Sequence, residues 1–541
     1  MKKVRLAAER WERGFIEEAG KVLEVSDLTG REREALNLTR MDDVVESAWF
    51  EHRNGRRRMS PAEVRAGAAR APGPDTSRIL TVVSGKLEGA QPGFTVEDGR
   101  GDRYLIKFDP RGFLGLASSA DVITSRLLYA AGYHTPADYI VVFDSRRLKV
   151  APDAEIVVGG VPRRMTPRDA EKILAAADRL PDGRYLALAS RFVPGVPKGP
   201  FLFKGRRKDD PNDHYRHHYR RELRGLFVLA AWLNHGDLVF QNTMDVWIDP
   251  PGYLRHYLID FGSSLGSGGV ASHRPRAEVE HDFAFWPTMA RLFTFGFYRV
   301  GWEGWEWEVI HPSIGWLPAE RYDPSAWKVN WPGQAWRLRT PADAYWGAKL
   351  VASFTDAQIR AAVDAAGLEP VAADTLARIL IHRRDRTVKH WYGKVTPVED
   401  VTALRTPAAS GRFPGAGEDA GGSTRRVPAE RNGALRVAFE DLGLEEGLWS
   451  PRETRYEWRF RHPALKRESE GRLPAAAGER QILSVGFKDR LEPAEVAVSE
   501  REAIATLELT ALRSGVGGRE AVIYLEWGGP GEGYRVVGLR H

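Results

Sequence analysis

The order of apolar and polar residues first indicates a strand-rich region. From about residue 78, apolar residues alternate with polar ones or form short runs between glycines, a pattern typical of strands. This pattern occurs in ILTVVSG (79–85), GFTVED (93–98), DRYLIKFD (102–109), DYIVVFD (138–144) and RYLALASRFVPG (184–195). Residues 118–132 have apolar positions at helical spacing and end at Gly132, which predicts one helix among these strands. We therefore expect a small antiparallel β lobe with one early helix.

A helical region follows, from residue 196 to residue 405. Its clearest amphipathic patterns lie at residues 356–367 and 373–393, and residues 218–233 form a more apolar helix. Many of the 17 tryptophans lie between Trp286 and Trp346. Such a cluster could be a sugar- or base-stacking surface, but we expect it to form a packed core.

The remaining segments differ in composition. Residues 1–80 are charged and mostly helical in pattern, and the SPAE sequence at 60–63 has the residues that cap and start a helix. Residues 406–433 are rich in Gly, Pro, Ala and Ser, which predicts a linker. Residues 434–541 contain short strand patterns at regular spacing, typical of an all-β sandwich-like domain. We therefore divide the chain into 1–80, 81–195, 196–405, 406–433 and 434–541, an α+β protein with a C-terminal all-β domain.

Composition and charge exclude several classes of function. The chain has no cysteine, which excludes disulfides, thiolate zinc sites and a cysteine nucleophile. Its net charge of +6 is small for 541 residues and does not indicate nucleic-acid binding. No apolar run approaches the roughly 20 residues of a membrane span, and the N-terminal residues lack a signal-peptide pattern. We expect a cytoplasmic protein, or an exported one if a signal peptide has been removed.

Basic residues are concentrated between Lys198 and Arg224. This stretch holds nine Lys/Arg against four Asp/Glu. Two interpretations stay open. The stretch could supply positive charge to a neighbouring site and bind an anionic substrate. It could equally be a solvated, charged surface insertion.

Three oxygen-bearing side chains follow the apolar helix at 218–233. Asp237 stands in a His-Gly-Asp-Leu sequence, Asn242 follows five residues later, and Asp260 begins an Asp-Phe-Gly sequence 18 residues further on. Phosphoryl transfer to a hydroxyl requires a carboxylate that orients the hydroxyl, and oxygen ligands for the magnesium that neutralises the triphosphate. This order and spacing is the catalytic-loop signature of kinases. The alternative is that these residues cap their own loops.

With HGDL, the following Asn and LIDFG, the chain resembles the aminoglycoside phosphotransferase and choline kinase branch of the protein-kinase-like superfamily. More loosely, it resembles bacterial atypical protein kinases. The resemblance implies a two-lobed fold with ATP between a small β lobe and a helical lobe. It implies that Asp237 is the catalytic base and that Asn242 and Asp260 bind Mg²⁺. The sequence His281-Asp282-Phe283-Ala284 is similar to a later motif of that branch, which supports the catalytic loop.

Lys107 and Asp121 are candidate partners in the small lobe. Lys107 ends an otherwise apolar strand, where its ammonium group could reach the α- and β-phosphates, although a solvent-exposed lysine is the alternative. Asp121 could pair with Lys107, as the resemblance implies. It could equally belong to a capping box with Ser118.

Two further segments are expected to contact the nucleotide. The loop containing Gly85, Lys86 and Gly89 joins two strands, and its glycines would let backbone N–H groups approach phosphate, unless it is a plain hairpin loop. By the resemblance, the adenine-contacting segment lies near Ser190 and Phe192.

The sequence therefore predicts a phosphotransferase that uses ATP and Mg²⁺ and acts on a hydroxyl acceptor. A small-molecule acceptor is favoured, possibly an anionic one, and a protein acceptor is the second choice. The alternative is a pseudokinase, a nucleotide-binding scaffold whose β domain binds a protein or glycan partner. Val239, the irregular glycine loop and the aspartate at position 121 favour it. Val239 and Phe240 stand where many relatives have a lysine or a histidine and proline.

Overall fold

The computed structural model describes residues 33–86, 91–158, 161–282, 285–404, 435–463, 466–478, 480–486, 504–528 and 533–541. The chain forms two compact units. The first comprises the residues up to Asn37 and Val45–Val388, and the second comprises Leu38–Val44 and Lys389–His541. Gly89 and the predicted linker lie outside the described residues. Along the part of the chain that is described, no helix is long and apolar enough to cross a membrane.

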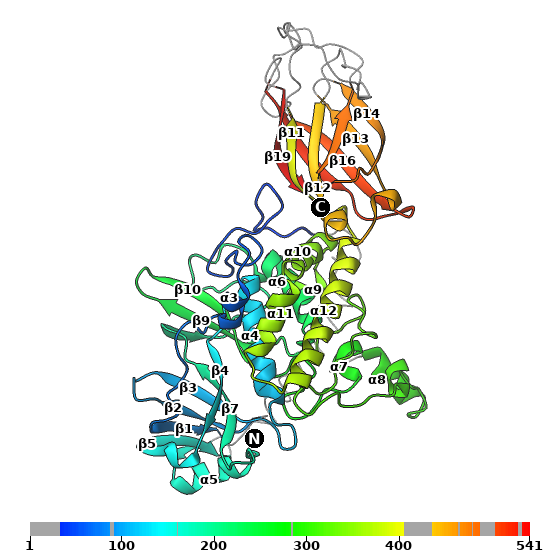
Figure 1. Ribbon diagram of the computed structural model, residues 1–541. Coiled ribbons are helices and arrows are strands. Elements are labelled where there is room, and N and C mark those ends of the chain that lie inside the picture. Colours follow the sequence, from blue (N-terminus) through cyan, green and yellow to red (C-terminus); the bar gives the residue numbers. More distant parts are fainter. Residues whose placement is uncertain are drawn as a thin grey trace, which may run out of the picture. The chain divides into compact units, whose positions relative to one another are not determined.

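The first unit contains a seven-stranded sheet of order β4-β7-β3-β2-β1-β5-β6 (Figure 1). Its strands are β1 (Leu80–Lys86), β2 (Gly93–Glu97), β3 (Arg103–Lys107), β4 (Asp138–Phe143), β5 (Leu148–Val158), β6 (Val161–Arg164) and β7 (Tyr185–Arg191). The five predicted strands are confirmed. The hairpin of β5 and β6 was missed, and β5 pairs with β1 in parallel, so the sheet is not purely antiparallel as predicted.

An irregularity in β5 explains why its pattern was missed. The register of the β1–β5 pair passes from Val82↔Val150 to Ser84↔Glu155, so four residues of β5 bulge out of the ladder. Pro152 lies in this bulge, and proline is tolerated in a strand only at such irregular or edge positions. The sequence pattern of β5 therefore indicates two short fragments around a turn and not one long strand.

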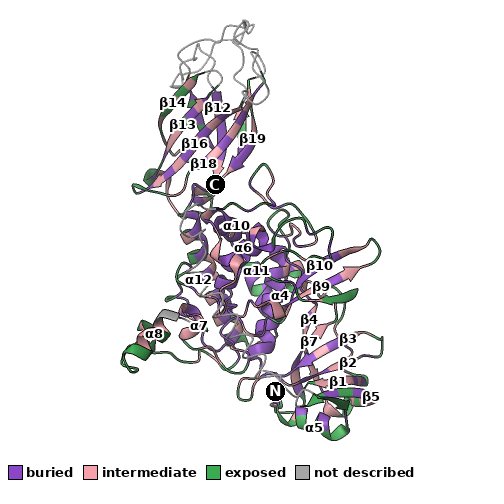
Figure 2. Cartoon of the chain, turned by 180° about the vertical axis from the view of Figure 1, so that it is seen from behind, coloured by how far each residue is buried: buried purple, intermediate pink, exposed green. Residues whose placement is uncertain are grey.

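The two faces of the sheet carry different helices. One face forms an apolar core with buried side chains such as Phe94, Tyr104 and Ile106, and Ile173 of helix α5 (Pro167–Ala175) belongs to the same core. Helix α4 (Leu116–Ala131), the predicted helix, packs against β4 and β7. It is buried along almost its whole length (Figure 2). Helix α4 thereby holds its polar side chains in a fixed place beside the sheet.

The rest of the first unit is mainly helical, with one small three-stranded sheet. Its elements are helix α3 (Pro61–Ala66), strands β8 (Val196–Gly199), β9 (Thr243–Ile248) and β10 (Tyr253–Leu258), and helices α6 (Arg221–Trp232), α7 (Arg276–Val279), α8 (Phe285–Phe293), α9 (Gln334–Arg337), α10 (Pro341–Ala352), α11 (Asp356–Asp364) and α12 (Pro370–Tyr392). The predicted helices at 218–233, 356–367 and 373–393 are confirmed. The predicted cap at Ser60 is also confirmed, because its side chain accepts from Glu63 N–H.

Helices α6 and α10 pack closely because each carries a glycine at the crossing. A Cβ atom on Gly225 would lie 2.6 Å from the ring of Trp346, and one on Gly347 would lie 2.6 Å from the carbonyl oxygen of Gly225. Tryptophan side chains fill the surrounding core, and Trp232, Trp327 and Trp346 are almost completely buried. The expectation of a packed aromatic core between Trp286 and Trp346 is therefore confirmed for Trp327 and Trp346.

The basic stretch from Lys198 to Arg224 forms buried ion pairs. Arg221 and Arg224 both bind the carboxylate of Asp343, at 3.1 and 2.9 Å, and all three side chains are at most 3% exposed. Arg207 binds the buried Asp245 at 2.7 Å. Buried charges require such partners. Arg207, Arg221 and Arg224 are therefore not available to bind an anion, and they do not form a solvated surface. Both interpretations of the basic stretch are wrong for these three residues.

The second unit contains two antiparallel sheets. One has the order β11-β12-β15, and the other has the order β14-β13-β16-β18-β19, with β17 beside β16. The strands are β11 (Val398–Leu404), β12 (Leu435–Asp441), β13 (Thr454–His462), β14 (Arg467–Pro474), β15 (Arg480–Val485), β16 (Ile504–Arg513), β17 (Val516–Gly517), β18 (Ala521–Trp527) and β19 (Tyr534–Arg540). Buried residues of both sheets share one apolar core. Strands β12, β13, β15, β16, β18 and β19 match the short strand patterns of the sequence, whereas β11, β14 and β17 were missed.

Candidate functional site

Lys107 forms the centre of the candidate site. It is the last residue of β3, and its Nζ atom lies 2.7 Å from Asp260 Oδ1 and 3.3 Å from Asp121 Oδ2. The side chains of Lys107 and Asp121 are 5% and 3% exposed, whereas that of Asp260 is 45% exposed. The structure thus joins three of the predicted residues from β3, α4 and the segment after β10. The solvent-exposed alternative for Lys107 is wrong.

Gly93, which lies opposite Lys107 in the sheet, has no room for a side chain. Gly93 of β2 pairs with Lys107 in the sheet register. A Cβ atom on Gly93 would lie 2.0 Å from the carbonyl oxygen of Ile106, closer than any real contact. Glycine at this position therefore lets β2 and β3 approach each other at the site.

The charges of this cluster control its protonation. Burial by itself would lower the pKa of Lys107, but the negative charges of Asp121 and Asp260 outweigh it and raise the pKa above the usual lysine value. Burial would raise the pKa of Asp260, but the positive charge of Lys107 dominates and lowers it. Lys107 and Asp260 are therefore both charged at neutral pH. For Asp121, burial has the largest effect and raises the pKa.

The predicted capping box at Ser118 and Asp121 is wrong. Helix α4 begins at Leu116, so Asp121 lies in its second turn and not at its cap. The carboxylate of Asp109 takes the capping role, because it accepts hydrogen bonds from the N–H groups of Ala117 and Ser118, both at 2.8 Å. Asp121 is consequently available to Lys107, and its other oxygen accepts a hydrogen bond from the N–H of Phe261 at 3.2 Å.

Asp237 and Asn242 form the second part of the site. The Nδ2 atom of Asn242 donates to the Asp237 carboxylate at 3.0 Å and to its backbone carbonyl at 2.9 Å. With its amide nitrogen used in this way, Asn242 has its Oδ1 atom as the group that could bind a cation. The backbone carbonyl of Asn242 accepts from Ile259 N–H at 3.0 Å, which places Asn242 beside the residue preceding Asp260.

The loop that carries Asp237 is held by Asn330, which the sequence analysis did not single out. Asn330 N–H donates to Gly236 carbonyl, and Asp282 N–H donates to Asn330 carbonyl, both at 2.9 Å. His281 of the same predicted motif contacts the carbonyl of Val329 at 2.5 Å through Nδ1. The motif at 281–284 thus reaches the loop through residues 329 and 330. Phe283 and Ala284 lie outside the described residues.

Arg383 of α12 supports the same loop from its other end. Its guanidinium donates to the carbonyls of Ala231 and Trp232, at 2.8 and 2.9 Å, and binds Glu278 at 2.7 Å. Arg383 is completely buried. It therefore satisfies the free carbonyls at the C-terminal end of α6, just before the loop. A charged residue within an amphipathic helix gives no sequence signal for such a role.

The backbone at Asp260 has an unusual conformation. Its φ angle is +64°, a left-handed conformation that is uncommon for residues other than glycine. The neighbouring Phe261 is buried, and its ring contacts that of His235 with centroids 5.7 Å apart. His235 is itself buried, and burial lowers its pKa. The two motifs of the site therefore pack directly against each other.

Two of the remaining predicted nucleotide contacts, Gly85 and Lys86, lie at the end of β1. Lys86 is the last residue of β1, which lies beyond β2 from the strand of Lys107, and it is exposed. Gly85 lies in β1, where a Cβ atom would meet Met165 at 2.9 Å, so it faces the apolar core and not the cluster. Gly85 is therefore poorly placed to contact phosphate.

Ser190 and Phe192 lie at the end of β7. Ser190 pairs with Leu105 and Asp138 in the sheet register. Phe192 follows the strand, its side chain is 51% exposed, and its N–H donates to the carbonyl of Arg103 at 2.9 Å. This N–H is therefore not free for adenine, which would have to contact other backbone atoms of the segment.

The donor set of the site suits magnesium. One carboxylate, of Asp260, and one amide oxygen, of Asn242, come from neighbouring backbone segments. Mg²⁺ is commonly bound by one or two protein oxygens together with phosphate and water. Within the described ranges, no group of three or more His, Asp or Glu residues could hold a metal ion by itself. The site fits a metal that a nucleotide brings with it.

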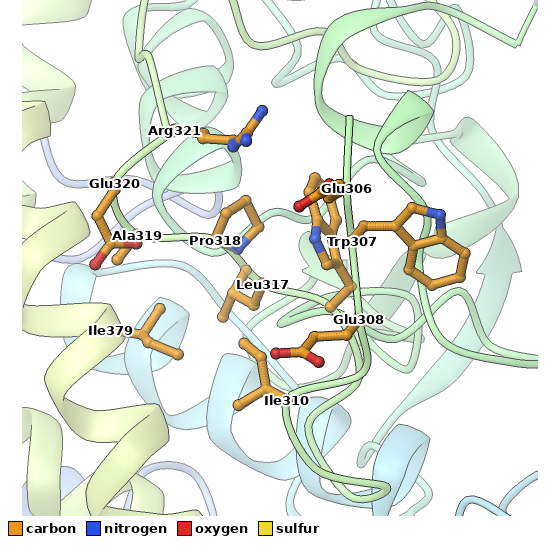
Figure 3. Close-up of a pocket in the computed structure, with 11 residues that line it drawn as sticks. Glu306, Trp307, Glu308, Ile310, Leu317, Pro318, Ala319, Glu320, Arg321 and Ile379 are labelled. Carbon is orange, nitrogen blue, oxygen red and sulfur yellow. The ribbon is translucent and has the colours of Figure 1, made fainter. Parts of the chain in front are cut away.

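A separate cavity of about 580 Å³ contains none of these residues. Glu306, Glu308 and Trp307 lie on one side of it, and Glu320 and Ile379 lie on the other (Figure 3). Trp307 is 42% exposed, so the expectation of core packing is wrong for this tryptophan.

Comparisons with known proteins give no family for this chain. No protein-family model matches it, and no curated protein matches its sequence. A solved structure described as the crystal structure of the Golgi casein kinase aligns with 70% of this chain and 87% of its own, with a TM-score of 0.29 and 10% sequence identity. A similarity of this size carries no argument about the activity of this chain.

Proposed function

We propose that the first unit is a phosphotransferase that uses ATP and Mg²⁺ and transfers the γ-phosphoryl group to a hydroxyl acceptor. The observation that carries the proposal is the buried ammonium group of Lys107 between Asp121 and Asp260. A buried lysine held by two carboxylates, one of them 45% exposed, is an arrangement in which one carboxylate can turn to a metal ion while the other keeps the lysine in place.

Each residue has a defined task in this proposal. Lys107, fixed by Asp121, binds phosphate oxygens of the nucleotide. Asp260 and the Oδ1 atom of Asn242 bind Mg²⁺, which when bound neutralises the triphosphate. Asp237 orients the acceptor hydroxyl and takes its proton, while its hydrogen bond to Asn242 keeps it beside the metal ligand.

The repulsion within the cluster explains why a metal would be bound there. Asp121 and Asp260 are both close to Lys107, and the negative charge of Asp260 contributes to the raised pKa of Asp121, after burial. One lysine neutralises only one of these charges. A divalent cation at Asp260 would compensate the second charge, and the Lys107 ammonium would then be shared between Asp121 and the phosphates.

Ligand-induced stabilisation tests this proposal. In the presence of Mg²⁺, ATP at about 100 times its dissociation constant should stabilise the protein by about 2.7 kcal/mol. The measurement is the midpoint of thermal unfolding with ATP plus Mg²⁺, with ATP plus EDTA, and with Mg²⁺ alone. We expect a clear increase only in the first condition. An equal increase in EDTA would contradict the metal assignment, and no increase in any condition would contradict nucleotide binding.

A further inference from the structure

A cavity of about 590 Å³ lies in the first unit, away from the candidate phosphotransferase site. This volume is within the usual range of small-molecule pockets. Lys107, Asp121, Asp237, Asn242 and Asp260 do not line it, although Phe192 of the predicted adenine-contacting segment does. Its wall includes Tyr129, which lies eight residues after Asp121 in α4, or about 12 Å along the helix. It also includes Arg255 and Tyr257 of β10.

His134 lines this cavity and has a buried ring N–H without a hydrogen-bond partner among the described residues. The residue is only 5% exposed, and its Nδ1 atom lies 3.3 Å from Nη2 of Arg53. A guanidinium can only donate, so Nδ1 is the acceptor and the ring carries its proton on Nε2. Burial, assisted by the charges of Arg53 and Arg255, lowers the pKa of His134 to about 3, so the ring is neutral at neutral pH. Among the described residues, Nε2 has no hydrogen-bond partner.

Arg255 supplies a second unused donor. Its Nε atom is buried and has no acceptor within the described part of the chain, whereas Nη2 donates to the hydroxyl group of Tyr253. Tyr253 also stacks on the guanidinium at 5.5 Å and limits its movement. A buried N–H group without an acceptor costs free energy, and native proteins rarely leave one without a partner or a ligand.

The charge of the cavity wall is positive. Four arginines and two carboxylates line it. Arg53 pairs with Glu51, Arg191 pairs with Asp102, and Arg103 pairs with Glu97 outside the wall, so among the described residues Arg255 carries the one arginine charge of the wall without a carboxylate partner. Arg53 is held by the carbonyls of Tyr129 and Tyr133, at 2.6 and 2.8 Å, so it fixes the wall and the orientation of His134. A positive wall with two unused donors favours a ligand that carries a negatively charged acceptor.

We propose that this cavity binds a small ligand through a phosphoryl or carboxylate group, which accepts hydrogen bonds from Nε2 of His134 and Nε of Arg255. Both groups have several oxygen lone pairs and can accept from two donors at once. Phe192, whose side chain is 51% exposed, lines the same cavity and offers apolar contact to the rest of the ligand. The binding of this ligand does not depend on the phosphotransferase activity proposed above.

Isothermal titration calorimetry of the full chain in phosphate-free buffer tests the proposal, with inorganic phosphate and with succinate as probes. We expect at least one probe to bind the wild type. Arg255→Met and Arg255→Lys both remove the Nε donor, and each should weaken that binding at least about tenfold. The lysine variant keeps the charge, so its loss of affinity separates the directed hydrogen bond from general electrostatic attraction. The tighter probe identifies the group that the site prefers.

Two control variants make the outcome specific. Arg147→Met removes an exposed arginine that does not line the cavity and should leave the affinity unchanged. Asp260→Asn alters the candidate phosphotransferase site and should also leave it unchanged, so failure of one proposal is distinguishable from failure of the other. Circular dichroism verifies that each variant is folded. The proposal is overturned if neither probe binds the wild type, or if both Arg255 variants bind as tightly as the wild type.

Discussion

Replacing Asp260 with asparagine is expected to reduce Mg²⁺-dependent ATP turnover by about 10³-fold or more, since charge stabilisation by a bound metal contributes several kcal/mol. The substitution removes the carboxylate that would hold Mg²⁺ and also the nearest negative charge to Lys107, at 2.7 Å. The readout is the rate of ATP consumption at saturating Mg²⁺. The midpoint of thermal unfolding is a second measurement on the same variant. The Mg²⁺-dependent part of the stabilisation by ATP should disappear together with the activity.

The control for this variant is Asp182→Asn in the same sheet-containing part of the unit. Asp182 is about half exposed and pairs with the exposed Arg184, so its replacement should leave turnover and Mg²⁺ response unchanged. If Asp260→Asn keeps both the turnover and the Mg²⁺-dependent stabilisation of the wild type, Asp260 is not a metal ligand.

Replacing Asp237 with alanine should separate chemistry from binding. We expect turnover to fall by about 10²- to 10⁴-fold, the usual contribution of a positioned general base. Nucleotide binding should be largely retained, because Lys107 and Asp260 do not bond to Asp237. The measurement is the rate of ATP consumption together with the dissociation constant of Mg-ATP from a stability titration.

The comparison for Asp237→Ala is Asp374→Ala on the exposed face of α12, where the carboxylate pairs with Arg360 and Arg378. Exposed pairs of this kind contribute at most about 1 kcal/mol, so this variant should keep full activity. Equal turnover in Asp237→Ala and the wild type would remove Asp237 from the catalytic role. A wild type that binds Mg-ATP without consuming it would favour the pseudokinase alternative.

The sequence predicted those elements whose residues follow a simple local pattern. The strands that contain Lys107 and Ser190, helix α4 and the amphipathic helices α11 and α12 were all found from apolar periodicity. Strand β5 was missed because its bulge around Pro152 interrupts the alternation. Strand β14 was missed because its polar residues occupy both faces, so no apolar stripe marks it.

Site residues that belong to a sequence motif could be predicted. Site residues that are brought together only by tertiary contacts could not. The pairing of Lys107 with Asp121 was one of two alternatives that the sequence left open, the other being that Asp121 caps its own helix, and the contact of Lys107 with Asp260 was not predicted. Asp109 takes that capping role from outside the helix, which local spacing cannot show. The supports from Asn330 and Arg383 are likewise contacts between segments almost 100 residues or more apart in the chain.

The basic stretch from Lys198 to Arg224 also shows that a sequence does not reveal contacts with distant residues. A run of arginines looks like a surface or an anion site in the sequence, because the sequence does not show the partners. The partner of Arg221 and Arg224 is Asp343, more than 100 residues later, and it makes the pair part of the core. Charge counts in a sequence therefore indicate function only after distant partners are known.

A crystal structure of the protein with Mg²⁺ and a non-hydrolysable ATP analogue tests the central claim most directly. We expect a metal ion bound by Asp260 and by Oδ1 of Asn242 at the Mg–O distance of about 2.1 Å, with Lys107 contacting a phosphate oxygen and still bound to Asp121. A nucleotide bound elsewhere, or a metal ion that contacts neither Asp260 nor Asn242, would contradict the account.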